Sequence, residues 1–134
     1  MAYWILKTEP TVYSYADLER DGRTVWDGVT NNKALKNIRS MRRGDLAMVY
    51  HTGEEKQVVG IAEIDSDPYD DPKRKGANLV VVELQPRQKV QRPVTLAAVK
   101  ADPSLKQFEL VRLPRLSVVP VDAPTWKKLL AMAK

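Results

Sequence analysis

The residues best suited to chemistry are an aromatic ring and an amide that flank a turn. Trp26 precedes Asp27-Gly28, where the chain must turn, so its ring can face a cleft. Asn31 follows and offers both a hydrogen-bond donor and an acceptor. An unstacked nucleobase needs an aromatic surface and a few polar groups for its edge, and these residues supply both. Each also has a structural alternative, Trp26 as a core side chain and Asn31 as a helix cap.

Polar side chains at the ends of short apolar segments can supply the other walls of such a pocket. Lys7 and Thr8 end one predicted strand, where Glu9 can orient Lys7 or a backbone amide. His51 ends another, and its alternative is a structural hydrogen bond; for Ser117 the alternative is a buried, backbone-bonded serine. These side chains, with Tyr50 beside His51, could line one cleft together with Trp26 and Asn31.

A basic segment follows the pocket residues. Residues 33–43 contain five basic residues and no acidic one, in a chain with a net charge of +5 and a pI near 9.5. At about 100° per residue, Ala34, Leu35, Ile38 and Met41 share one face of a helix. The opposite face is basic, which favours contact with phosphates over the alternative of a plain solvated surface. The predicted phosphate-binding residues are Lys33, Lys36, Arg39 and Arg43.

The sequence gives little support for catalysis or for a bound metal. It has no cysteine, one histidine, no nucleophile elbow and no Gly-rich phosphate loop. Its one carboxylate cluster, Asp65 to Asp71, lies in a segment broken by proline, which is typical of a solvated turn. We expect no metal, no cofactor and no enzymatic activity. The alternative is an enzyme or binder for a nucleotide-like small molecule that uses His51, Lys7 and Glu9.

The elements that must position these residues are short. The length of the chain predicts one domain over residues 1–134, and we expect it to be monomeric. We expect it to be cytoplasmic, because no segment could span a membrane or act as a signal peptide. The fold class is α+β, a small curved mixed sheet or partial barrel flanked by short helices. The predicted strands are Tyr3–Thr8, Thr24–Trp26, Leu46–His51, Gln57–Ile64 with a possible bulge at Gly60, Asn78–Val90 bent near Pro86, and Leu116–Val119 ending at Pro120. The predicted helices begin at Ser14, Asn31, Thr95 and Asp122 and end near Gly22, Met41, Ala101 and Ala133, with a short turn at Asp102–Ser104 and a loop over Asp67–Gly76.

Several short motifs, in order along nearly the whole chain, resemble those of one known family. They are Lys7-Thr8-Glu9-Pro10, Trp26-Asp27-Gly28-Val29, Tyr50-His51-Thr52, Val59-Gly60-Ile61-Ala62-Glu63, Arg92-Pro93-Val94-Thr95-Leu96 and Arg115-Leu116-Ser117-Val118. These resemble the marks of the EVE domain, a PUA-like domain related to the YTH readers of methylated RNA. The resemblance implies a PUA-like pseudo-barrel and a pocket for a modified base in DNA or RNA, with no established catalytic activity. With this resemblance, we predict that the base pocket is built from Trp26, Asn31, Lys7, Thr8, Tyr50, His51 and Ser117.

The chain departs from the family pattern after Val29. The family commonly has Arg-Asn-Tyr-Gln-Ala-Arg-Asn there, whereas this chain has Thr30-Asn31-Asn32-Lys33-Ala34-Leu35-Lys36. Asn31 and Ala34 remain, but the tyrosine and both arginines are missing. The added lysines restore the charge, but they lack the planar guanidinium, which stacks on aromatic rings and forms bidentate hydrogen bonds.

Overall fold

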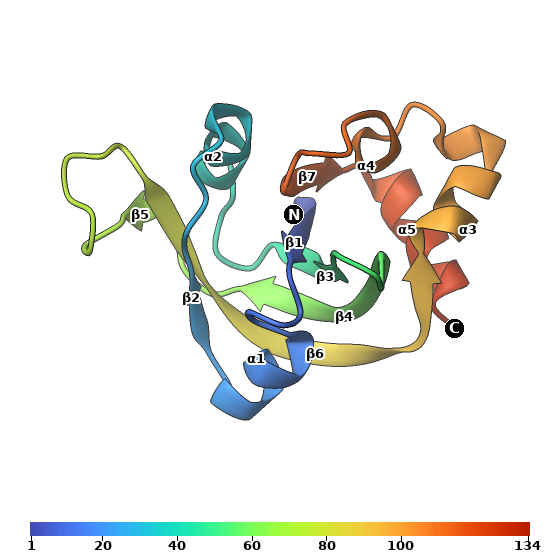
Figure 1. Ribbon diagram of the computed structural model, residues 1–134, viewed down its shortest axis with the longest axis horizontal. Coiled ribbons are helices and arrows are strands. Elements are labelled where there is room, and N and C mark those ends of the chain that lie inside the picture. Colours follow the sequence, from blue (N-terminus) through green and yellow to red (C-terminus); the bar gives the residue numbers. More distant parts are fainter.

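A strongly curved sheet with short helices around its rim forms the body of the molecule (Figure 1). This computed structural model describes residues 1–134. Its strands are β1 (Tyr3–Thr8), β2 (Thr24–Trp26), β3 (Leu46–His51), β4 (Gln57–Ile64), β5 (Tyr69–Asp70), β6 (Val80–Thr95) and β7 (Val118–Val121). Its helices are α1 (Tyr15–Asp21), α2 (Asn32–Arg39), α3 (Leu96–Ala101), the 3₁₀ turn Pro103–Leu105, α4 (Glu109–Arg112) and α5 (Ala123–Met132).

The sheet is mixed and curls into a partial barrel. Its strand order is β2-β6-β4-β3-β1-β7, and β5 pairs with β6 outside this path. Only β1 and β3 are parallel. The 16-residue β6 spans the front of the sheet in Figure 1, and its register with β4 shifts at two places, which is how bulges bend a sheet. Helix α2 packs on both β6 and β7, which lie toward opposite ends of the strand order, and so spans the open part of the barrel. The fold is a PUA-like pseudo-barrel of the α+β class.

The core fills the inside of the curl with aliphatic side chains. Ile5, Leu6, Met48 and Ile64 have no exposed surface. Because Ile5 and Leu6 are consecutive and lie on opposite faces of β1, this strand is covered on both faces. One carboxylate lies among these aliphatic side chains. Asp45 accepts hydrogen bonds from the backbone N–H of Ala2 and Arg42 and from the indole N–H of Trp4. Asp45 therefore ties the N-terminus to the turn after α2.

Helix α1 packs on the sheet through its buried residues Tyr15 and Leu18. Ser14 caps the helix in a reciprocal capping box with Asp17, and Gly22 ends it with a left-handed φ of 73°. Tyr15 lies with its ring directly over Gly60 of β4, so close that a Cβ there would stand 2.4 Å from the ring. The Tyr15 hydroxyl donates to the carbonyl of Ile61. The absence of a side chain at Gly60 thus fixes where α1, and the loop before it, can lie.

The sequence predicted most of these elements, and the differences have physical causes. The capped starts of α1, α2, α3 and α5 are confirmed, as is the irregularity beside Gly60. Helix α2 was predicted to reach Met41 but ends at Arg39, so Arg43 lies in the turn beyond it. The segment predicted as a loop contains β5, which forms because Tyr69–Asp70 pairs with β6. Strand β7 runs through Pro120 instead of ending there, since an edge position tolerates proline. Helix α4 was missed, and β6 extends past Val90 to Thr95. The irregularity predicted near Pro86 is confirmed, because the register with β4 shifts between Pro86 and Gln88.

Substituting Gly60 by alanine should destabilise the fold by about 1–3 kcal/mol, the typical cost of overpacking a well-packed core. The added methyl must displace the Tyr15 ring and its hydrogen bond to Ile61. Urea unfolding measures the change. In a Tyr15→Ala background the same substitution should cost clearly less, because the ring is gone. Equal costs in the two backgrounds would show that the Gly60 contact does not fix α1.

Candidate functional site

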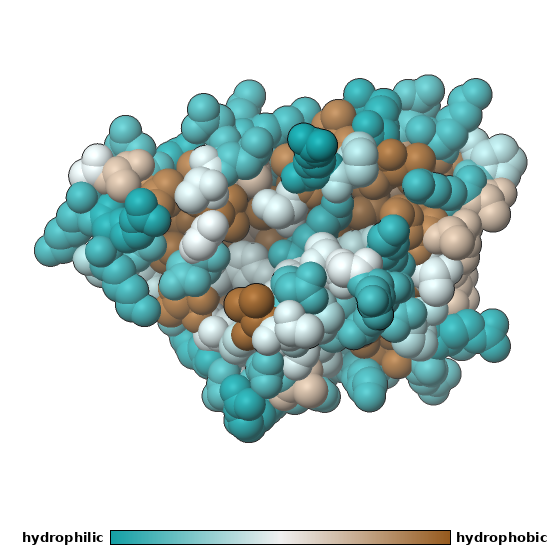
Figure 2. All heavy atoms as spheres, in the orientation of Figure 1, coloured by the Kyte–Doolittle hydropathy of each residue, from teal (hydrophilic) through white to brown (hydrophobic).

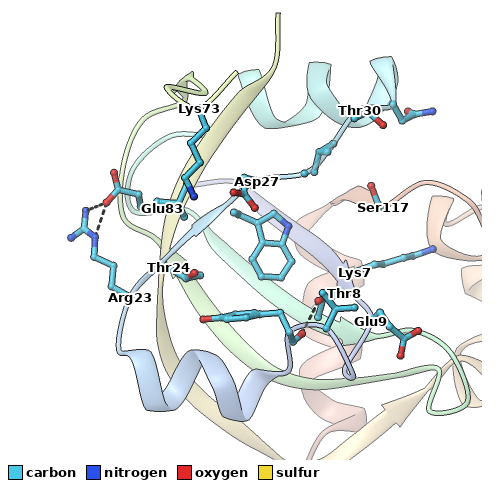
Figure 3. Close-up of a pocket in the computed structure, with 17 residues that line it drawn as sticks. Lys7, Thr8, Glu9, Arg23, Thr24, Asp27, Thr30, Lys73, Glu83 and Ser117 are labelled. Atoms are coloured by element: carbon cyan, nitrogen blue, oxygen red, sulfur yellow. Dashed lines mark hydrogen bonds and ion pairs between the residues drawn. The ribbon is translucent and has the colours of Figure 1, made fainter. Parts of the chain in front are cut away.

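One large open cavity of about 990 Å³ lies between the end of β1, strand β2 with the segment after it, and the loop that joins β5 to β6. Figure 3 shows Lys73 reaching toward it from that loop, with Lys7 and Ser117 on the other side and Asp27 between them. The lining residues are Lys7, Thr8, Glu9, Val12, Tyr13, Arg23, Thr24, Val25, Trp26, Asp27, Gly28, Val29, Thr30, Asn31, Lys73, Glu83 and Ser117.

Trp26 belongs both to the core and to the wall of the cavity. Its exposed fraction is 8%, and it is part of the main hydrophobic cluster. It also lines the cavity, where the ring of Tyr13 meets it edge-on with centroids 6.3 Å apart at 81°. The edge-on contact holds the indole in one orientation. The two sequence interpretations of Trp26 are therefore compatible.

The turn after Trp26 places polar groups along the same wall. Gly28 has a φ of 78°, which favours glycine, and it lets the chain reverse into α2. Asn31 is the N-cap of α2, because its Oδ1 accepts from the N–H of Ala34 at 3.0 Å. That bond fixes the amide, and its NH₂ group has no partner within the protein. Asp27 is exposed and has no hydrogen-bond or ion-pair partner. The wall thus offers a free carboxylate and a free amide donor.

The end of β1 forms the opposite wall. Lys7 donates from Nζ to the carbonyl of Pro114 at 3.0 Å, with its ammonium 5.6 Å from the centroid of the Tyr50 ring. Partial burial lowers the pKa of Lys7 from its ordinary value. The Thr8 hydroxyl donates to the carbonyl of Tyr13, which closes the loop between β1 and α1. Ser117 lines the cavity, and its carbonyl accepts from the backbone N–H of Lys7.

Two residues predicted for the pocket lie outside the cavity wall. Tyr50 is buried beneath Lys7, and burial raises its pKa. His51 is buried beside α1, where Nε2 accepts from the N–H of Tyr15 at 3.0 Å and Nδ1 lies 2.9 Å from a carboxylate oxygen of Glu55. Because Nε2 accepts, the proton lies on Nδ1 and is donated to Glu55. His51 thus makes structural hydrogen bonds, the alternative given for it above. Lys7 and Glu9 line the cavity, whereas His51 does not.

Sequence reasoning missed a charged network at the rim of the cavity. Arg23 pairs with Glu83 and with Asp65, and the hydroxyl of Tyr69 donates to Glu83 at 2.9 Å. The hydrogen bonds from Tyr69 and Arg23 lower the pKa of Glu83. These residues come from the position before β2, from β5 and β6, and from the segment after β4, so no local pattern could predict the network. Lys73 belongs to a basic loop, Lys73-Arg74-Lys75, between β5 and β6, and it also lines the cavity.

The basic face of α2 is partly neutralised by neighbours from other elements. Lys33 pairs with Glu109 of α4 at 3.1 Å, and Arg43 lies 3.8 Å from Asp65. Arg39 donates to the carbonyl of Asn78 at 2.8 Å, which places α2 beside the basic loop 73–75. Lys36 is exposed and has no ion-pair partner. The end of α2 and the segment that carries the basic loop are therefore neighbours.

The structure contains no helix that is long and apolar enough to cross a membrane. No group of three or more His, Cys, Asp or Glu side chains is arranged to hold a metal ion.

Comparison with known proteins shows similarity over nearly the whole chain. Thymocyte nuclear protein 1 from Rattus norvegicus is 27% identical, and the match covers 97% of this chain and 73% of that protein. The solved structure of Rpa0253 from Rhodopseudomonas palustris is 42% identical with a TM-score of 0.94, covering 99% of this chain and 93% of that one. Human THYN1 protein, solved in complex with DNA that contains 5-methylcytosine, is 23% identical with a TM-score of 0.91 and covers 100% and 98% of the two chains.

The sequence model of the EVE domain matches residues 2–132. The motifs that suggested this family are thus supported by the chain as a whole, and the structural likeness agrees with the predicted fold. The chain belongs to the EVE domain family.

Proposed function

We propose that this domain binds nucleic acid without catalysing a reaction and holds one modified base of it in the cavity. The observation that carries the proposal is the indole of Trp26, fixed edge-on by Tyr13 at the wall of an open cavity of about 990 Å³. Cavities of roughly 300–1,000 Å³ are those in which proteins bind small aromatic ligands. The structural relative in complex with 5-methylcytosine DNA supports a methylated base in DNA as the first candidate.

The polar groups of the wall suit the edge of such a base. Asp27 can accept from an exocyclic amino group, and the NH₂ of Asn31 can donate to a ring nitrogen or a carbonyl. The hydroxyl of Ser117 can serve from the opposite side of the cavity. A base must leave its stack to reach these groups, so the cavity reads one nucleotide at a time.

Phosphate contacts come from the basic side that α2 and the loop 73–75 share. Among the four residues predicted for this role, Lys36 is free, and Arg39 is bound only to a carbonyl. Lys33 and Arg43 are held in exposed ion pairs, which typically contribute less than about 1 kcal/mol, so a phosphate can compete for them. Lys73 extends this surface to the mouth of the cavity.

Replacing Trp26 by leucine should weaken binding of an oligonucleotide with one 5-methylcytosine by about 1–3 kcal/mol, the usual contribution of stacking on an aromatic ring. The preference over unmodified cytosine should also fall, because the 5-methyl group loses its contact with the ring. Binding titrations in both DNA and RNA measure these changes. Stability must be followed by urea unfolding, although leucine should cost less than the 3–5 kcal/mol of truncation to alanine.

Trp126→Leu is the matched control. Trp126 is also buried, and it stacks on Tyr3 at 4.6 Å, away from the residues that line the cavity. It should lose stability without losing preference for the modified base. If both tryptophan variants keep that preference, Trp26 is not the base-stacking surface.

The double variant Lys36→Ala, Arg39→Ala should weaken binding to modified and unmodified oligonucleotides alike. The slope of log K against log salt should flatten by about 0.7–0.9 for each phosphate contact removed. A control that removes the same charge from α5 and the C-terminus, Lys127→Ala with Lys134→Ala, should leave the slope as it is in the parent. A parent protein whose ligand binding shows no salt slope would instead favour a nucleotide-like small molecule in the cavity.

A further inference from the structure

The mouth of the cavity carries apolar side chains that face solvent. Three large hydrophobic residues in the protein are exposed, namely Met1 at the N-terminus, Val12 at 79% and Val25 at 44%. Both valines line the cavity. Figure 2 shows this face of the molecule, where hydrophobic surface borders a hollow among mostly hydrophilic atoms. Single exposed hydrophobic residues need no explanation, but here both internal ones gather at one site.

Val12 is presented by a tight and well-bonded turn. The backbone N–H groups of Val12 and Tyr13 both donate to the carbonyl of Glu9 at 2.9 Å, and the Thr8 hydroxyl closes the loop onto Tyr13 at 2.7 Å. The carboxylate of Glu9 is directed away, since it lies against Gly53 and within reach of the hydroxyl of Thr52. The loop therefore projects an apolar side chain in a fixed position, without a negative charge in front of it.

A duplex that gives up a base to the cavity is left with a gap in its stack. Proteins that distort duplexes commonly fill such openings with an apolar side chain, because leaving apolar base faces in contact with water is unfavourable. Trp26 and Val12 line the same cavity, one buried at its wall and the other exposed at its mouth. We infer that Val12 is a wedge that enters a double-stranded nucleic acid at the position vacated by the base held on Trp26.

Val12 suits this role better than Val25. Val25 belongs to β2, where it pairs with Glu83 of β6, so its side chain is carried on a sheet edge and is little more than half as exposed. Val12 has no strand partner and stands at the tip of a turn. This inference rests on the proposed function, and it adds that the natural ligand is double-stranded.

The test compares a duplex carrying one 5-methylcytosine with the single strand of the same sequence. Because a single strand has no gap to fill, Val12→Ser should lower the ratio of duplex affinity to single-strand affinity by about tenfold, the effect of burying roughly two methyl groups. Val12→Ile should keep the ratio, since it preserves an apolar side chain. Val25→Ser, the matched control at the same cavity, should change the ratio by less than about twofold.

A 2-aminopurine placed beside the modified base reports on unstacking. Its fluorescence should rise when the parent or Val12→Ile binds the duplex, and should rise clearly less with Val12→Ser at saturating protein. An unchanged ratio with Val12→Ser, or the same loss for duplex and single strand, overturns the wedge. A parent that binds only the single strand overturns the wedge and leaves the proposed function intact, whereas a parent that binds neither overturns both.

Discussion

The position of Tyr15 on Gly60 is the constraint on which the cavity depends. The ring can lie against β4 only because residue 60 has no side chain, and its hydroxyl and backbone N–H are both used, on Ile61 and His51. These contacts hold α1, and α1 holds the loop before it. That loop carries Tyr13, which fixes the indole of Trp26. The contact between Tyr15 and Gly60 thus sets the orientation of the Trp26 indole, through the loop that carries Tyr13.

The main wall of the site is part of the core. Trp26 has little exposed surface and packs with the buried cluster. Asn31 likewise has two roles, because its Oδ1 caps α2 and its unpaired NH₂ group is left for the cavity that the residue lines. Because such residues stabilise the fold and also line the cavity, substituting them changes both stability and binding. Substitutions at the site are therefore best interpreted beside a matched residue elsewhere in the core.

Charge around the cavity is organised by pairing between distant segments. Acidic residues of α4 and of the segment after β4 occupy Lys33 and Arg43, and Arg23 is taken up by Glu83 and Asp65. The cations left without ion-pair partners near the cavity include Lys36 and the loop 73–75. The link from Arg39 to Asn78 brings these two groups to one side. The fold thus brings together two basic segments that lie far apart in the chain.

The sequence by itself determined the capped helix starts, the apolar strands and the family, because these depend on residues close together along the chain. Ser14, Asn31, Thr95 and Asp122 each accept a hydrogen bond from a residue three positions on, which local sequence predicts well. Trp26, Asn31, Lys7, Thr8 and Ser117, which the sequence singles out, all line the cavity. Only the tertiary structure decided that His51 and Tyr50 are buried outside it, that β5 pairs with β6, and that Glu109 and Asp65 neutralise part of the basic surface. Each of these depends on partners far apart in the chain, whose meeting is set by the curl of the sheet.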